Sequence, residues 1–222
     1  MKSSKNKPDT KNKIILFDFD GVIVDSFDIA FEVQKIVHPG LTKDDYRGFF
    51  NGNVNDWTDG FSLERDEAEK INQEFWRLYI PRMNQVKVVA GIKDIIVELD
   101  KIYNLIIVSS CMTSSIRELM KRYDMVSHFD EIMGNDVHTS KIEKIRMVFE
   151  KHNVEPDNCV FVTDTLGDIK EATFTEVKSI GVAWGFQDKE NLLKGDPFRI
   201  AEKPEELISI ISEYFRNEKS RA

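Results

Sequence analysis

Residues 13–26 constrain the fold of this chain more than any other stretch. The segment opens with an apolar run, residues 14–17, and then presents two acids, Asp18 and Asp20, followed by Gly21. A continuous apolar run of this kind is typical of a parallel strand buried on both faces. Ligands of an open α/β sheet bind beyond the carboxyl ends of its strands, and the i, i+2 spacing lets both carboxylates face one side of an extended chain. We therefore expect a functional site where this strand ends.

The chemistry of that site follows from the repulsion between two carboxylates in a partly dehydrated cleft. A divalent cation can hold the pair together, or one carboxyl group can stay protonated because its pKa is raised. A carboxylate held in this way can act as a nucleophile, and a neighbouring carboxyl group with a raised pKa can donate and accept a proton. A cap for a turn or a helix would require only one acid. Asp18 and Asp20 are therefore predicted to be catalytic or metal-binding residues.

The remaining chain predicts an α/β core with a helical insertion. Apolar residues recur at helical spacing through residues 27–87, with no strand pattern, and strand and helix patterns alternate from residue 88 onward. This alternation predicts a doubly wound parallel sheet with helices on both faces. The helical block is longer than a crossover needs, so we expect an inserted all-helical cap over the carboxyl edge of the sheet. The core would comprise residues 13–26 and 88–222, and the polar, lysine-rich residues 1–12 would form a disordered tail.

Composition argues against several classes of function. The net charge is −8, from 31 basic and 39 acidic residues, whereas a nucleic-acid-binding surface needs concentrated positive charge. The chain has no run of about 18 apolar residues, so we expect no membrane span. Residues 1–12 lack the apolar segment of a secretory signal, and Cys111 and Cys159 have neither disulfide-framework nor metal-site spacing. We expect a cytoplasmic protein with neither a nucleic-acid nor a membrane partner, and the sequence does not indicate its oligomeric state.

Further polar residues follow the other predicted strands. Ser109 and Ser110 end the second strand, Lys141 comes shortly after the third, and Asp164 and Asp168 follow the fourth. Each has an ordinary interpretation when taken alone, as a helix cap, a solvated lysine or an acid in the first turn of a helix. Together they form a cluster of carboxylates that would repel phosphate unless Mg²⁺ and the lysine reversed the charge. Magnesium prefers a few carboxylates, a carbonyl and waters, which this set can supply.

The chain thereby resembles the haloacid dehalogenase (HAD) superfamily, of the phosphoglycolate phosphatase and β-phosphoglucomutase type. The first motif of that family, Asp-x-Asp-Gly-[Val/Thr], matches residues 18–22, and its Gly-Asp-x-x-x-Asp motif is similar to residues 163–168. The strand ending in Ser109 and the lysine at position 141 match the two motifs between them. The resemblance extends from residue 13 to about residue 212. It departs from the family at Thr163, where a glycine is usual, and at residues 141–144, which replace Lys-Pro-x-Pro.

The resemblance implies a role for each matching residue. Asp18 would be the nucleophile that forms an aspartyl-phosphate, and Asp20 would be the general acid and base. The phosphate group would be bound by Ser109, Ser110 and Lys141. A Mg²⁺ ion would be held by Asp18, Asp20 through its backbone carbonyl, and Asp164, with Asp168 supporting the metal shell. The helical insertion would close over the site and recognise the leaving group, for which the candidates are Arg47, Asn53, Asn55 and Trp57.

These observations predict a Mg²⁺-dependent phosphatase that hydrolyses a phosphate monoester of a small metabolite through a phospho-aspartate intermediate. A phosphosugar mutase of the β-phosphoglucomutase type remains an alternative, because it shares the chemistry. Two alternatives of other classes are a non-catalytic HAD-like binding protein and a phosphorylation switch of the receiver type. In the receiver type the lysine follows all the acids, whereas here Asp164 and Asp168 follow Lys141. The substrate itself is not specified by the sequence.

Overall fold

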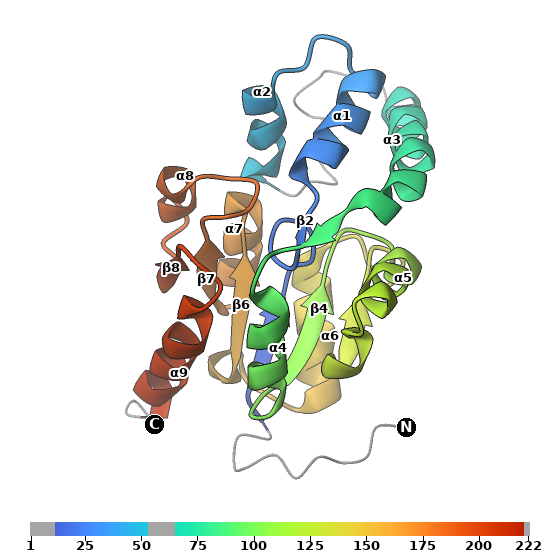
Figure 1. Ribbon diagram of the computed structural model, residues 1–222. Helices are drawn as coiled ribbons and strands as arrows, with labels where there is room; N and C mark the ends of the chain where they lie inside the picture. Colours follow the sequence, from blue (N-terminus) through green and yellow to red (C-terminus); the bar gives the residue numbers. More distant parts are fainter. Residues whose placement is uncertain (1–11, 53–64, 220–222) are drawn as a thin grey trace.

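The computed structural model describes residues 12–52 and 65–219 (Figure 1). The tail expected over residues 1–12 lies outside this description apart from its last residue. The centre of the molecule is a six-stranded sheet in the order β5-β4-β1-β6-β7-β8, and every pairing in it is parallel. The strands are β1 (Ile14–Phe17), β4 (Asn104–Val108), β5 (Glu131–Met133), β6 (Cys159–Thr163), β7 (Lys178–Val182) and β8 (Arg199–Ala201).

Helices cover both faces of the sheet, as the continuous apolar character of β1 predicts. Ile15 and Phe17 belong to one hydrophobic cluster, and Ile14 and Leu16 belong to another on the opposite face. The first cluster includes side chains of three helices: α4 (Ile92–Asp100), α5 (Thr113–Arg122) and α9 (Glu206–Lys219). The second includes side chains of α6 (Lys141–His152) and α7 (Leu166–Phe174). The predicted doubly wound sheet is confirmed.

A group of helices lies beyond the carboxyl ends of the strands, at the top of Figure 1. It consists of α1 (Phe27–Val37), α2 (Lys43–Gly48), η1 (Phe49–Asn51), α3 (Arg65–Tyr79) and η3 (Ile80–Gln85). The short strands β2 (Val24–Asp25) and β3 (Lys87–Val88) pair in antiparallel fashion where the chain enters and leaves this group. The expectation of helix alone over residues 27–87 thus misses a strand at its end, because two residues are too few to produce an alternating pattern. None of the described helices is long and apolar enough to cross a membrane.

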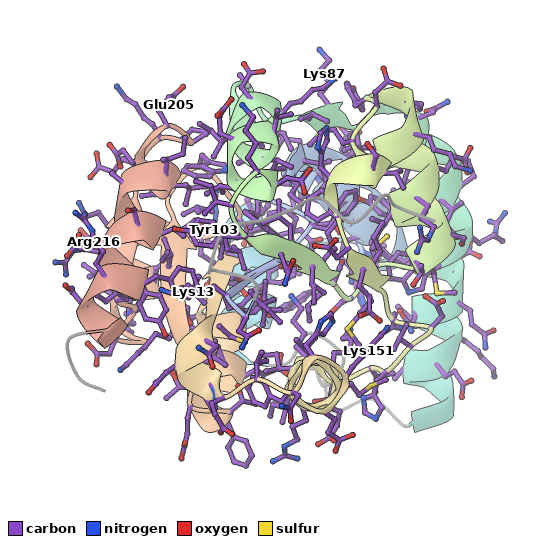
Figure 2. The ribbon with its side chains drawn as sticks, turned by 90° about the horizontal axis from the view of Figure 1, so that it is seen from below. Lys13, Lys87, Tyr103, Lys151, Glu205 and Arg216 are labelled. Carbon is purple, nitrogen blue, oxygen red and sulfur yellow. The ribbon has the colours of Figure 1, made fainter. Side chains whose placement is uncertain are left out.

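The opposite end of the sheet is closed by side chains from α9. Lys13 and Tyr103 lie near the amino ends of β1 and β4, as seen from below in Figure 2. The Nζ atom of Lys13 donates a hydrogen bond to the carbonyl oxygen of Phe215 at 2.8 Å, and the ring of Tyr103 stacks on that of Phe215 with centroids 5.2 Å apart. The shorter elements η4 (Val126–His128), η5 (Pro156–Asn158) and α8 (Lys189–Leu193) complete the fold. The carboxyl edge is therefore where the fold leaves room for a site.

Candidate active site

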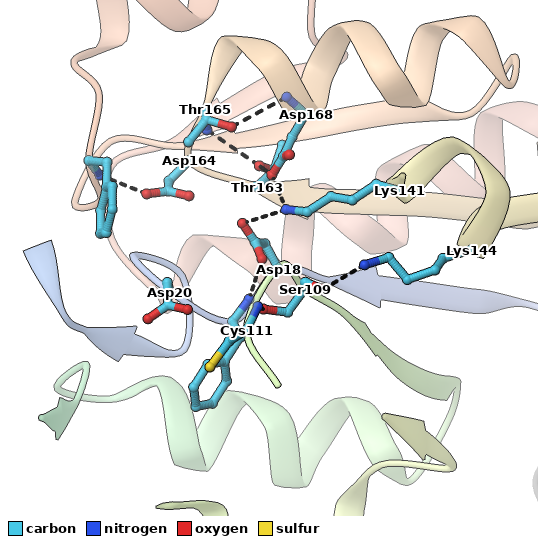
Figure 3. Close-up of polar contacts among 12 residues, drawn as sticks. Asp18, Asp20, Ser109, Cys111, Lys141, Lys144, Thr163, Asp164, Thr165 and Asp168 are labelled. Atoms are coloured by element: carbon cyan, nitrogen blue, oxygen red, sulfur yellow. Dashed lines mark hydrogen bonds and ion pairs between the residues drawn. The ribbon is translucent and has the colours of Figure 1, made fainter. Parts of the chain in front are cut away.

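The three central strands bring the predicted site residues together. Because β4, β1 and β6 are neighbours, the residues that follow them meet at one edge of the sheet, where the first turns of α6 and α7 also lie. Figure 3 shows this cluster. The residues at this edge that line one cavity are Asp18, Asp20, Ser109, Ser110, Lys141, Asp164 and Asp168. The structure thus places all of the core residues predicted from the sequence around the same space.

Lys141 joins two of the carboxylates. Its Nζ atom lies 2.9 Å from Oδ2 of Asp18 and 2.6 Å from Oδ2 of Asp168, and all three side chains are buried. The hydroxyl group of Thr163 donates to the same oxygen of Asp168 at 2.6 Å. Burial acts to lower the pKa of Lys141, but the two adjacent acids outweigh it and leave that pKa raised. Burial acts to raise the pKa of Asp168, but Lys141 and these hydrogen bonds leave it lowered. Both groups are therefore charged, and the ammonium group is fixed beside Asp18.

Asp18 is oriented by the sheet and by the turn that follows it. Its backbone N–H donates to the carbonyl oxygen of Val162 at 2.9 Å, which continues the ladder between β1 and β6. Its Oδ1 atom accepts a hydrogen bond from the N–H of Phe19 at 2.7 Å. Burial raises the pKa of Asp18, although Lys141 opposes the shift. A further positive charge at the site would therefore favour the ionised carboxylate that nucleophilic attack requires.

Asp20 is held by two hydroxyl groups from separate segments of the chain. Its Oδ1 atom accepts hydrogen bonds from the Ser26 hydroxyl at 2.6 Å and from the Tyr79 hydroxyl at 3.1 Å. Burial raises the pKa of Asp20, while these two hydrogen bonds and Lys141 reduce the shift. A carboxyl group with a raised pKa is suited to proton transfer near neutral pH. Tyr79 is the last residue of α3, so the inserted helices contribute directly to the site, a contact that helical spacing alone does not reveal.

Asp164 carries the one carboxylate oxygen of this cluster that is both buried and without a hydrogen-bond partner in the described structure. Its Oδ2 atom accepts from the N–H of Phe186 at 2.7 Å, whereas Oδ1 has no partner. Burial raises the pKa of Asp164 to about 7. Gly21 and Gly185 pack against this side chain so closely that a Cβ atom at either position would overlap it. The glycine after Asp20 is thus required by the close approach of Asp164.

The residues fit a Mg²⁺ ion. Among the described residues no group of three or more His, Cys, Asp or Glu is arranged to hold a metal ion by itself. Mg²⁺ usually takes only one or two carboxylates and keeps several waters. Asp18 and Asp164 can supply these carboxylates, and the buried Oδ1 of Asp164 is an orphaned acceptor of the kind that a cation satisfies. Asp168 instead faces Lys141, so in this structure it orients the lysine.

The loop after β4 is fixed by a second buried lysine. The N–H of Cys111 donates to Oγ of Ser109 at 3.0 Å, and Nζ of Lys144 donates to the carbonyl oxygen of Ser109 at 2.6 Å. The Lys144 side chain is fully buried, and burial together with nearby Lys141 lowers its pKa to about 8. Sequence reasoning did not single out Lys144. The available signal was its i+3 spacing from Lys141, which places both lysines on one face of α6.

The predicted cap residues are distributed differently. The Arg47 guanidinium donates to the Phe186 carbonyl oxygen at 3.2 Å and pairs with Asp44 at 3.0 Å, and Arg47 does not line the cavity around Asp18. Asn53, Asn55 and Trp57 lie outside the described residues. The inserted helices instead contribute aromatic side chains to this cavity.

Comparison with known proteins agrees with this geometry. The family model described as "Haloacid dehalogenase-like hydrolase" matches residues 15–182. A phosphoglycolate phosphatase from Synechococcus elongatus is 21% identical over 208 residues, covering 91% of this chain and 98% of that protein. A 5'-nucleotidase from Pseudomonas aeruginosa is 24% identical over 197 residues, covering 82% of this chain and 88% of that protein. The crystal structure of a predicted phosphatase from Clostridium acetobutylicum superposes with a TM-score of 0.81 at 22% identity, covering 90% and 98% of the two chains. The chain therefore belongs to the haloacid dehalogenase-like hydrolases.

Proposed function

We propose that this protein is a Mg²⁺-dependent phosphatase that hydrolyses a phosphate monoester of a small metabolite through a phospho-aspartate intermediate. The observation that carries the proposal is the position of Lys141, fixed between Asp18 and Asp168 on the floor of a cavity that also contains the orphaned oxygen of Asp164. This is a site for a dianionic group beside a carboxylate nucleophile. The names of the relatives, a phosphoglycolate phosphatase and a 5'-nucleotidase, support phosphate-ester chemistry.

The proposed reaction has two steps. A carboxylate oxygen of Asp18 forms a bond to phosphorus while the ester P–O bond breaks, and Asp20 donates its proton to the departing oxygen. Asp20 then accepts a proton from water as that water attacks phosphorus and releases Asp18. Lys141, Ser109 and Ser110 bind the phosphoryl oxygens throughout. A bound Mg²⁺, held by Asp18, Asp164 and the backbone carbonyl of Asp20, would neutralise charge on the phosphoryl group.

The inserted helices are proposed to act as a cap that covers this reaction. Tyr79 of α3 reaches Asp20, and the paired strands β2 and β3 form the junction about which such a cap would move. Closure would exclude bulk water while Asp18 attacks phosphorus. The proton of Asp20 would then go to the departing oxygen.

The test is phosphate release from a panel of phosphate monoesters, with Mg²⁺ and with EDTA, by the wild type, Asp18→Asn and Asp20→Asn. We expect Mg²⁺-dependent release that is abolished in Asp18→Asn and reduced by about 10²–10⁴-fold in Asp20→Asn. Both variants should keep the circular dichroism spectrum of the wild type, because each change conserves shape. Near-normal turnover by Asp18→Asn would disprove the nucleophile assignment. Isomerised sugar phosphates without phosphate release would establish the mutase alternative instead.

A further inference from the structure

Aromatic side chains form one wall of the cavity beside the proposed phosphate site. Tyr46, Phe49 and Phe50 come from α2 and η1, Phe75 and Trp76 come from α3, and Phe186 comes from the loop after β7. Several pairs of these rings contact each other edge to face, with centroids 5.0 Å apart between Phe50 and Phe186 and 5.3 Å apart between Phe75 and Trp76. The wall therefore belongs to the packed structure and presents a largely apolar surface to whatever the phosphate carries.

Positive charge is confined to the floor of this cavity. Among the described residues that line it, the only lysine or arginine is Lys141, which is already paired with Asp18 and Asp168. The basic side chains of α2 are used elsewhere, since Lys43 pairs with Asp28 and Arg47 pairs with Asp44. Residues 53–64 contain no lysine or arginine, although they contain three acids. A second negative charge on a substrate would thus meet apolar surface and no counter-charge, and burying an unpaired charge is costly.

The polar groups on the wall are neutral. Gln34 of α1 is buried and Asn72 of α3 is exposed, and both side chains line the cavity. Amides can hydrogen-bond to hydroxyl, carbonyl or ring nitrogen groups, but they cannot neutralise a carboxylate. The cavity, which includes the proposed phosphate site, measures about 160 Å³, so it favours a compact leaving group.

We infer, on the basis of the proposed function, that the substrate is a phosphate monoester whose leaving group is uncharged and presents an aromatic or otherwise apolar face. The aromatic wall would pack against that face, and Gln34 and Asn72 would bind its neutral polar groups. Leaving groups that carry a carboxylate or a further phosphate are disfavoured. Phosphoglycolate, the substrate named for several relatives, belongs to the disfavoured class.

The test compares two substrates that have the same shape and differ in charge, 4-carbamoylbenzyl phosphate and 4-carboxybenzyl phosphate. We expect kcat/KM to be higher for the carbamoyl compound by about tenfold or more, mainly through a lower KM. Equal values, or a preference for the carboxylate, would overturn the inference and leave the proposed function intact. If folded protein released no phosphate from either compound, from benzyl phosphate or from any member of the panel above, the proposed function itself would fail.

A pair of variants tests whether the cavity wall causes the preference. Asn72→Lys adds a cation to the wall at an exposed position, and Gln73→Lys adds the same charge to the next residue of α3, which does not line the cavity. Asn72→Lys should reduce the preference for the carbamoyl compound at least about threefold by improving KM for the carboxylate. Gln73→Lys should leave the preference unchanged. Equal shifts in both variants would show that overall charge, and not the wall, sets the preference, which would refute the inference.

Discussion

At the scale of single residues, Lys144 shows how burial can serve the site at a cost to stability. Its ammonium group is fully buried and faces Lys141, Asp18, Asp168 and Glu171, and its hydrogen bond to the Ser109 carbonyl fixes the loop that is proposed to bind phosphate. Burial lowers the pKa of Lys144 from 10.5 to about 8. The folded protein therefore incurs a free-energy penalty when this lysine is protonated.

The sign of the pH dependence follows from that lowered pKa. Between pH 8 and pH 10.5 the unfolded chain still binds the proton that the folded protein has released, so the free energy of unfolding rises with pH. We expect this contribution, at most about 3 kcal/mol, to be absent in Lys144→Met. The variant should be close to the wild type in stability at about pH 7 and less stable at about pH 10, because only then does the wild type gain from deprotonation.

Urea unfolding at both pH values measures this difference, with Lys151→Met as the control. Lys151 lies on the same helix, is exposed and pairs with Glu131, so Lys151→Met removes a lysine from α6 without removing a buried one. In phosphatase assays Lys144→Met should lower kcat/KM by roughly tenfold, because the Ser109 loop loses its support. If the free energy of unfolding changed with pH by the same amount in the wild type and in Lys144→Met, burial would not be lowering the pKa of Lys144.

At the scale of elements, Gln187 joins the inserted helices to the core. Its side chain is buried, its Nε2 atom donates to the Arg47 carbonyl at 2.8 Å and to Oδ1 of Asn51 at 3.0 Å, and its Oε1 atom accepts from the N–H of Leu166 at 2.7 Å. One side chain therefore holds α2 and η1 against the start of α7. Gly167 allows this approach, since a Cβ atom there would overlap the carbonyl oxygen of Gly52.

Gln187→Leu should weaken both stability and substrate binding. The change removes three hydrogen bonds and leaves the buried N–H of Leu166 and the partly buried carbonyl of Arg47 without these partners, which should lower the free energy of unfolding by about 2–4 kcal/mol. Phe50, which is part of the aromatic wall, belongs to η1, so we expect KM to rise more than kcat falls. Asn191→Ala is the control, because it removes only exposed hydrogen bonds, one to Asn51 and one from Lys194. An unchanged KM in Gln187→Leu would mean that this contact does not position the wall.

The elements also show what could be predicted from the sequence. The buried strand β1, the alternation from residue 88 onward and the strand-end positions of the site residues are local patterns, and the parallel sheet that they predict is confirmed. The roles of Tyr79, Lys144 and Gln187 depend on contacts with distant segments, which periodicity does not encode. Lys144 in particular has the sequence context of a solvated helix residue, yet it is fully buried. Strand β3 escaped prediction because it has only two residues and because its partner, β2, lies about sixty residues earlier in the chain.

At the scale of the whole molecule, the sheet and the inserted helices share one hydrophobic cluster. Ile15 and Phe17 of β1 belong to the same cluster as Phe31 of α1, Tyr46 of α2 and Tyr79 of α3. Residues 22–24, which connect the sheet to the insertion, are fully buried within it. The inserted helices would expose much of this cluster if they unfolded alone. We therefore expect the inserted helices and the core around the sheet to unfold in one transition.

Single-tryptophan variants can test this cooperativity. Trp76 lies on α3, and Trp184 lies near the core and donates to the Val22 carbonyl at 3.2 Å. Combining Trp57→Phe with either Trp184→Phe or Trp76→Phe leaves one reporter in the inserted helices or one in the core. Because both reporters border the shared cluster, urea unfolding followed by fluorescence should give the same midpoint and the same m-value in the two variants, and both should match the far-ultraviolet circular dichroism of each. A lower midpoint for Trp76 alone would mean that the inserted helices unfold first, and that the shared cluster does not couple them to the sheet.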